Sequence, residues 1–403
     1  MVATRRHIVF VINSLVGGGA ERALINIIGG LENELRDCRA CLVLLDQLPQ
    51  AYEAPAFVEK HVLDSRERFG ASLVNLTRSL HSLKPDVVVS FLSRANCANV
   101  FAAGILGYPA LISERVHTSS HFGGGFSAGL QKAIVGFFYR RARKIIAVSS
   151  GVERDLVGNF GVAPDRVTVI HNPIDTQKLM RLSQQGAASA DWPASYIAAV
   201  GRLVPNKNFA MTLRAFAASG EKGSLVIMGE GPERPALEAL AAELGIADRV
   251  LTPGYMANPF PVIAGAKYLV SSSNAEGFPN AIVEAMALGR PVIATDCESG
   301  PANILSPNIV PSKNGVTKGE FGLLAPVERP DLLAEAMKLF QDEAVLGDYR
   351  QRAKPRVGSY SPDMIAAQYW KTIASALPAD TVASGASNCA GLPERAGTTG
   401  SSL

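Results

Sequence analysis

The chain has few cysteines and no long apolar run. Its five cysteines, scattered over 403 residues, are Cys38, Cys41, Cys97, Cys297 and Cys389. The first two have C-x-x-C spacing, but no second pair completes a zinc site, so we interpret all five as free thiols in a reducing compartment. No run reaches the roughly 18 apolar residues that a membrane span needs. We therefore expect a cytoplasmic protein that could touch a membrane only at its surface.

Strong charge and two familiar ligand motifs are also missing. The formal net charge is only +3, which gives no case for bulk nucleic-acid binding. Gly17, Gly18 and Gly19 follow an apolar strand, but without the G-x-G-x-x-G spacing of dinucleotide-binding loops. No D-x-D arrangement is present that would hold a metal ion on a diphosphate. We expect no bound metal and no cofactor.

What the chain does contain is a regular alternation of short apolar strands and helices. Apolar residues make up 47% and charged residues 19%, as in a globular protein, and the length suffices for two domains. The predicted strands are 7–12, 39–45, 86–91, 110–112, 145–148, 196–200, 225–228, 268–270 and 291–294. Such alternation in two halves predicts an α/β fold with two parallel sheets and a cleft between them.

The expected boundaries follow composition. We predict a first domain over 1–180, a linker over 181–194 and a second domain over 195–361. A final amphipathic helix spans 362–377, and the tail 378–403 is rich in Ala, Gly, Ser and Thr, so it should be disordered.

The chain is organised around residues 271–301. A buried strand ends there in a small polar cluster, and a helix follows with Asn280 as its expected N-cap and Pro279 stiffening the turn. Free N–H groups and the positive end of the helix dipole at the carboxyl edge of a parallel sheet suit an anion. Glu276 and Glu284 are separated by about two turns plus 80° at roughly 3.6 residues per turn, so both can face one ligand.

Several other strand ends carry candidate ligand groups. Gly18 and Gly19 let a ligand approach the backbone, or they form only a tight turn. Arg202 and Lys207 share one loop and can neutralise a diphosphate, the alternative being two solvated charges. Glu114, Arg115 and His117 follow strand 110–112, where this architecture places chemistry, although an ordinary solvated loop fits equally.

Residues 130–145 combine apolar and basic side chains in a pattern typical of an amphipathic helix. Such a helix can lie on an anionic membrane surface, or it can pack on the core with a charged outer face. If the protein acts on a lipid-linked acceptor, we expect this helix to contact the membrane surface.

Three strings together resemble one known family. The sequence from Glu276 to Ala294, E-G-F-P-N-A-I-V-E-A-M-A-L-G-R-P-V-I-A, resembles the signature of the retaining nucleotide-sugar glycosyltransferases of family 4. G-R-L-x-x-x-K-N from Gly201, and A-V-S-S-G-V followed by V-I-H-N-P-I-D, are similar to that family too. The resemblance covers residues 7–377. It implies the GT-B fold of two Rossmann-like domains, with helix 362–377 crossing back onto the first.

The resemblance also implies roles for the candidate residues. Arg202 and Lys207 would bind the diphosphate and stabilise it as a leaving group. Glu276 would hold the hydroxyls of the donor sugar, and Glu284 those of the ribose. His117 would contact the donor sugar. The backbone of residues Gly277, Phe278, Pro279, Asn280 and Ala281 would contact the donor sugar and phosphate. Gly18 and Gly19 of the first loop would lie near the phosphates and the acceptor. Gly254 and Tyr255 of a later turn would contact the base.

The implied reaction moves a hexose or N-acetylhexosamine from a UDP-sugar to a glycan acceptor with retention. The Ser-Glu-Arg loop at 113–115 is similar to the corresponding loop of family members that build bacterial glycans on polyprenyl carriers. Such enzymes work at the cytoplasmic face of the inner membrane. Two alternatives stay open. Another GT-B enzyme, such as a nucleotide-sugar epimerase, would need further acid/base groups in the first domain. A non-catalytic nucleotide-sugar binder would have lost Glu276, Arg202 or Lys207.

Overall fold

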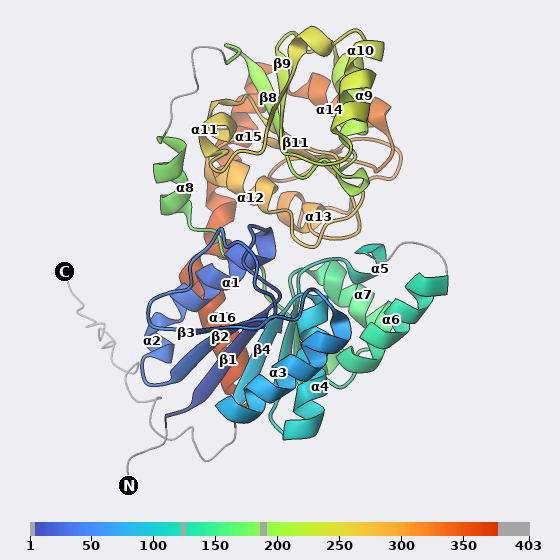
Figure 1. Ribbon diagram of the computed structural model, residues 1–403. Helices are drawn as coiled ribbons and strands as arrows, with labels where there is room; N and C mark the ends of the chain where they lie inside the picture. The colour runs from blue at the N-terminus through green and yellow to red at the C-terminus, as the bar shows by residue number, and fades with distance from the viewer. Residues whose placement is uncertain (1–4, 122–125, 186–191, 378–403) are drawn as a thin grey trace, which may run out of the picture.

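The computed structural model describes residues 5–121, 126–185 and 192–377 (Figure 1). Two seven-stranded sheets form two domains, one over the other in Figure 1. The strand orders are β3-β2-β1-β4-β5-β6-β7 and β10-β9-β8-β11-β12-β14-β13. The predicted α/β fold with two parallel-sheet domains is confirmed, the antiparallel pair of β13 and β14 being the exception at one edge.

The described part of the first domain contains seven parallel strands, five of which correspond to the predicted apolar runs. These are β1 (His7–Ile12), β2 (Arg39–Leu44), β3 (Glu59–Val62), β4 (Val87–Phe91), β5 (Ala110–Glu114), β6 (Lys144–Ala147) and β7 (Val167–Val169). All residues of β1, β4 and β5 are buried, because helices cover both faces of the sheet. The helices are α1 (Gly19–Gly30), α2 (Glu32–Leu35), α3 (Phe69–Leu83), α4 (Ser93–Leu106), α5 (Thr118–His121), α6 (Phe126–Tyr139), α7 (Ser150–Phe160) and α8 (Thr176–Ser183).

The second domain repeats this plan. Its strands are β8 (Tyr196–Val200), β9 (Ser224–Met228), β10 (Val250–Gly254), β11 (Leu269–Ser271), β12 (Val292–Thr295), β13 (Thr317–Lys318) and β14 (Leu323–Ala325). Its helices are α9 (Phe209–Ser219), α10 (Arg234–Glu243), α11 (Phe260–Gly265), α12 (Asn280–Ala287), α13 (Pro301–Leu305), α14 (Pro330–Leu339) and α15 (Glu343–Val357). In each sheet the strand order reverses, between β1 and β4 and between β8 and β11, which opens a crevice at the carboxyl ends of the strands.

The last helix, α16 (Pro362–Ala374), packs against α1 of the first domain. Ile365, Tyr369 and Ile373 are buried in the same core cluster as β1 and α1. The Tyr369 ring stacks on Phe91 with ring centroids 6.1 Å apart, and its hydroxyl lies 3.0 Å from a guanidinium nitrogen of Arg115. The chain therefore begins and ends its described part in the first domain.

Two predicted elements differ from the structure. The helix predicted over 130–145 is wrong in its extent, because α6 ends at Tyr139 and residues 144–145 belong to β6. Arg140 and Arg141 donate to the carbonyl oxygens of Phe160 and Phe137, and Ala142 is buried, so the chain turns here. The basic residues are therefore not one face of a helix.

The linker predicted over 181–194 begins inside α8, which runs to Ser183. Its middle and the tail 378–403 lie outside the described residues. Strand β3 is not among the predicted strands, because its largely exposed side chains give no run of apolar residues. Among the helices that the structure describes, none is long and apolar enough to cross a membrane.

Candidate functional site

A cavity of about 560 Å³ lies between the two domains, at the carboxyl ends of both sheets. The first domain supplies the glycine loop, Arg22 and Tyr52, and the second supplies the loops after β8, β9, β10 and β11. Of the residues singled out in the sequence, those that line the cavity are Gly18, Gly19, Arg202, Lys207, Tyr255, Glu276, Phe278, Pro279, Asn280, Ala281 and Glu284. Residues almost 270 positions apart thus meet around one space.

Lys207 and Glu276 form an ion pair at the wall of this cavity. The Lys207 ammonium lies 2.5 Å from Glu276 Oε1, which also accepts a hydrogen bond of 2.6 Å from Ser273 Oγ. Ser299 donates to the Glu276 backbone carbonyl and holds the loop in place. The Glu276 side chain is only 10% exposed, whereas Arg202 of the same cation loop is exposed and faces the cavity. The pair keeps a cation and a carboxylate at fixed positions.

Glu284 is bound across the cleft by a residue that sequence reasoning missed. Arg22, in the first turns of α1, forms an ion pair with the buried Glu284 carboxylate of α12. The attraction of Glu284 raises the pKa of Arg22 above its ordinary value. The signal was present in the sequence, because Arg22 directly follows the glycine loop and α1 begins at the cleft. In the described structure, the cavity lining therefore contains three cations, Arg22, Arg202 and Lys207, and three carboxylates, Glu230, Glu276 and Glu284.

Glycines allow the two domains to approach each other. A Cβ at Gly19 would lie 2.8 Å from the Asn280 side chain of the opposite domain. A Cβ at Gly277 would clash with the carbonyl oxygen of Arg115 in the first domain. Gly17 has φ of +122°, which a side chain disfavours. The glycines at these positions serve the turn and the contact between domains.

The N-terminus of α12 differs in detail from the prediction. Asn280 is the first residue of the helix, and Pro279 occupies the cap position without a side-chain cap. The Asn280 amide oxygen instead accepts a hydrogen bond of 2.7 Å from Asn172 of the first domain. The predicted N-cap is therefore wrong, because this side chain is used between the domains. Asn280 and Ala281 nevertheless line the cavity, so the positive end of the helix faces it.

Three predicted residues lie off the cavity lining in the described structure. Gly254 ends β10 with φ of +87° and turns the chain so that Tyr255, 70% exposed, reaches the cavity. Gly277 lies behind the loop, against the first domain. His117 lines a neighbouring polar cavity of about 430 Å³, also between the domains.

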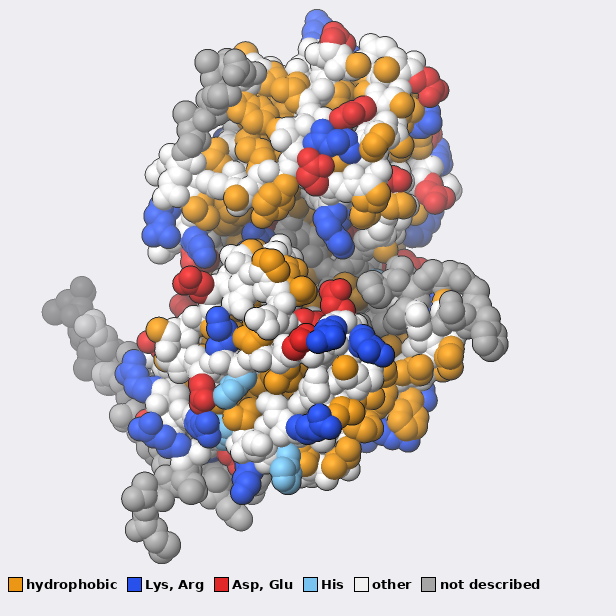
Figure 2. Space-filling model, viewed as in Figure 1, with side chains coloured by type: hydrophobic (Ala, Val, Ile, Leu, Met, Phe, Trp, Pro, Cys, Tyr) orange, Lys and Arg blue, Asp and Glu red, His pale blue; other side chains and the backbone are white. Residues whose placement is uncertain are grey.

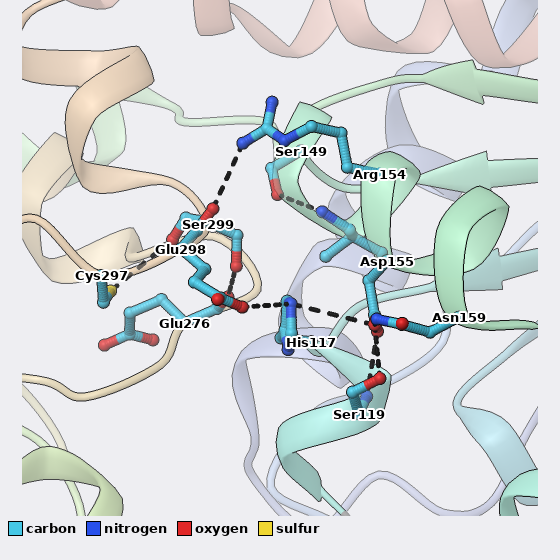
Figure 3. Close-up of polar contacts among 11 residues, drawn as sticks. His117, Ser119, Ser149, Arg154, Asp155, Asn159, Glu276, Cys297, Glu298 and Ser299 are labelled. Atoms are coloured by element: carbon cyan, nitrogen blue, oxygen red, sulfur yellow. Dashed lines mark hydrogen bonds and ion pairs between the residues drawn. The ribbon is translucent and has the colours of Figure 1, made fainter. Parts of the chain in front are cut away.

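The surroundings of His117 are shown in Figure 3. Its Nε2 lies 3.2 Å from a Glu298 carboxylate oxygen of the second domain and 4.0 Å from Asp155 Oδ1. Asp155 accepts hydrogen bonds from the Ser119 backbone N–H at 2.9 Å and from the Asn159 amide at 2.8 Å. Glu276 lies on the second-domain side of the same view. His117 is thus held beside the Glu276 loop but within a separate carboxylate-rich cavity.

Glu114 and Arg115 are buried rather than exposed to a ligand. The Glu114 carboxylate accepts hydrogen bonds from the backbone N–H groups of Arg115 and Val116 and from Tyr139, and burial raises its pKa. Burial lowers the pKa of Arg115, whose guanidinium faces Phe91 and Tyr369. Both side chains support the loop that carries His117.

Comparison with known proteins agrees with this geometry. A family model described as Glycosyltransferase Family 4 matches residues 17–178, and one described as Glycosyl transferases group 1 matches residues 194–342. The chain belongs to glycosyltransferase family 4. Its two matched ranges coincide with the two sheets, and the site lies between them.

Curated relatives of this family 4 glycosyltransferase include two characterised bacterial enzymes. It is 28% identical, over 70% of its length and 74% of the relative, to an N-acetylgalactosamine-N,N'-diacetylbacillosaminyl-diphospho-undecaprenol 4-alpha-N-acetylgalactosaminyltransferase of Campylobacter jejuni. It is 30% identical to the lipopolysaccharide 1,6-galactosyltransferase of Escherichia coli, over 41% of this chain and 46% of that protein.

Solved structures confirm the GT-B fold. Anabaena HepE in complex with UDP-glucose superposes with a TM-score of 0.71 at 21% identity, covering 92% of this chain and 99% of that one. Sucrose-phosphate synthase from Thermosynechococcus elongatus gives a TM-score of 0.75 at 18% identity, with the same coverage. At such identities the likeness concerns the fold.

Proposed function

We propose that this glycosyltransferase moves a hexose or N-acetylhexosamine from a UDP-sugar to a lipid-linked glycan, with retention, in the biosynthesis of a bacterial cell-surface polysaccharide or glycoconjugate. The observation that carries the proposal is the cavity in which Arg202, Lys207, Glu276 and Glu284 meet. The Campylobacter relative is named for a diphospho-undecaprenol acceptor, and HepE was crystallised with UDP-glucose. Both names support the proposed substrates.

In this proposal the diphosphate of the donor lies against the cation loop. Lys207 and Arg202 face the cavity together with the N-terminus of α12, so three positive groups surround an anion there. When the bond to the sugar breaks, negative charge grows on the leaving phosphate. Fixed cations in a narrow cleft stabilise that charge, which lowers the barrier.

The carboxylates orient the donor. Glu276 is fixed by Ser273 and Lys207, and its second oxygen is the proposed acceptor for sugar hydroxyls. Glu284 is the proposed hydrogen-bond acceptor for the ribose hydroxyls. When the donor binds, the Glu284 carboxylate would release Arg22 and bind these hydroxyls instead. Arg22 then remains in the cavity as a further cation for the diphosphate. His117 would approach the donor sugar from the neighbouring cavity.

The proposed reaction proceeds with the leaving phosphate helping to take the proton from the acceptor hydroxyl. That hydroxyl forms the new bond on the face from which the phosphate departs, which retains the anomeric configuration. The cations do the work that a metal ion would do, so the proposal includes metal independence. Attachment to the cytoplasmic face of a membrane is part of it, since a lipid-linked acceptor resides there.

The direct test is a transfer assay with a panel of UDP-sugars and an N-acetylhexosaminyl-diphospho-undecaprenol acceptor, in the presence and absence of EDTA. We expect transfer from one donor, a product with the donor's anomeric configuration by NMR, and no effect of EDTA. An inverted product would contradict retention. Activity that EDTA abolishes and added divalent metal restores would contradict the role of the cations.

A further inference from the structure

A second groove, of about 590 Å³ and mainly apolar, opens in the first domain at the point where its strand order reverses. Its floor is formed at the ends of β1, β4 and β5, and its walls by the first turns of α3 and α4 and by α6. Its lining includes the apolar residues Phe69, Leu92, Val116 and Ile134 and the polar residues Asn13 and Arg94. The crevice at such a reversal is where open α/β sheets bind ligands.

The inner end of this groove lies beside the proposed sugar-transfer site. A Cβ at Gly277 would lie 3.0 Å from the Cα of Val116, so the groove floor touches the loop that carries Glu276. At this end Asn13 Oδ1 is buried, and no hydrogen-bond partner for it is found in the described part of the chain. A ligand that enters from the cleft would satisfy this acceptor with a hydroxyl. The groove therefore ends beside the loop that carries Glu276.

The outer end of the groove is apolar and bordered by cations. Phe69 is 39% exposed and Phe137 47% exposed, and both rings lie against Phe138, at 6.4 and 5.4 Å between centroids. Figure 2 shows hydrophobic side chains gathered over α4 and α6, with Lys and Arg among them. The Arg141 guanidinium lies 3.6 Å from the Phe137 ring centroid. Exposed apolar surface of this kind marks a contact with an apolar partner.

We infer that this groove binds the isoprenoid chain of a diphosphate-linked acceptor, whose diphosphate and sugar then extend from the inner end of the groove toward the transfer site. The inference rests on the proposed function and adds the place where the lipid lies. A groove within the roughly 300–1,000 Å³ range of small-ligand sites holds a few isoprene units and leaves the rest of the chain in the bilayer. A soluble glycan would instead need polar walls, which Phe69, Leu92 and Ile134 do not provide.

The test uses photo-crosslinking with a farnesyl diphosphate that carries a benzophenone, competed by undecaprenyl diphosphate in detergent. We expect peptides with Phe69 and Ile134 to be labelled, and undecaprenyl diphosphate but not UDP to suppress the labelling. Ile134→Glu should reduce labelling about tenfold, because a charge replaces an apolar contact worth ~1.4 kcal/mol. Ile105→Glu is the matched control, since Ile105 is 60% exposed on α4 and outside the groove lining.

The outcomes separate this inference from the proposed function. Labelling confined to other surfaces would contradict binding of the isoprenoid chain in this groove. An equal loss of labelling in Ile134→Glu and Ile105→Glu would contradict it as well. Phe69→Ser, at a more exposed position, replaces Ile134→Glu if that variant unfolds. UDP-induced stabilisation of the same variants reports the donor site separately, because the probe carries no nucleoside and no sugar.

Discussion

At the scale of single residues, the site is a set of charges that neutralise one another until a donor arrives. Lys207 pairs with Glu276, and Arg22 with Glu284, around the cavity in which we propose that the diphosphate of the donor binds. Glu276 and Glu284 could be predicted, since their spacing in a helix-start motif is local. The place of Arg22 beside the glycine loop could have been recognised too. Its ion pair with Glu284 and the hydrogen bond from Asn172 to Asn280 could not be predicted, because they join residues 262 and 108 positions apart.

Glu276→Gln should reduce the transfer rate by about 10²-fold or more, while leaving the melting temperature nearly unchanged. The amide keeps the shape of the side chain but loses the charge that orients Lys207 and the sugar hydroxyls, and a misplaced substrate costs about this much. Steady-state transfer and thermal melting measure the two effects. Glu335→Gln, an exposed glutamate on α14, is the control that should keep full activity.

Arg22→Ala should raise the KM for the UDP-sugar about tenfold with a smaller effect on kcat. Once the ribose takes Glu284, Arg22 is the first-domain cation left to face the diphosphate, and a charge-assisted contact of this kind contributes about 1.5–3 kcal/mol at most. Donor titration at saturating acceptor measures it. A KM that stays the same or falls would show that Arg22 only competes with the donor for Glu284.

His171 predicts how stability responds to acid. Its ring stacks on Phe278 at 5.4 Å between centroids and contacts Tyr360, and burial lowers its pKa below the ordinary 6.5. The unfolded chain then binds more protons than the folded one as the pH falls below about 6.5, so the free energy of unfolding decreases there. His171→Gln should flatten this part of the stability curve. Urea unfolding between pH 7.5 and 5.5 measures the difference, and parallel curves for both proteins would contradict it.

At the scale of elements, the apolar strands were the most predictable feature and the surface elements the least. Strands such as 7–12 and 196–200 are buried on both faces and appear as continuous apolar runs. The exposed β3 has no such signal. The helix predicted over 130–145 continues too far past Tyr139, because periodicity alone does not reveal the turn in which Ala142 is buried.

Contacts between elements of opposite domains give another prediction. Gly277→Ala should abolish transfer while both domains stay folded, because the new methyl group meets the Arg115 carbonyl and holds the cleft open. Gly347→Ala is the matched control, since that position on α15 has open space around it and should gain about 0.5–1 kcal/mol of stability. Circular dichroism reports folding and the transfer assay reports the effect. Full activity of Gly277→Ala would show that the two backbones need not approach so closely.

At the scale of the whole molecule, neither domain contains the site by itself. The first contributes the glycine loop and Arg22, and the second contributes the cation loop and α12. The helix α16 returns to the first domain after the second is complete, so the chain crosses between domains twice. Sequence predicted the central strands of the two sheets, because these are local apolar patterns, but not edge strands such as β3 and β13. The arrangement of one sheet edge against the other depends on contacts such as Gly277 with Arg115, which no local pattern contains.

We propose above all that the cavity between the domains binds a nucleotide sugar through the loop of Arg202 and Lys207. The most direct measurement is calorimetric titration of the protein with UDP and with a panel of UDP-sugars, beside Lys207→Ala and the surface control Lys371→Ala. We expect binding of UDP, tighter binding of one UDP-sugar, and an affinity for both that is lower by about tenfold or more in Lys207→Ala but unchanged in Lys371→Ala. Absence of binding to every nucleotide, or equal affinity in Lys207→Ala, would contradict it.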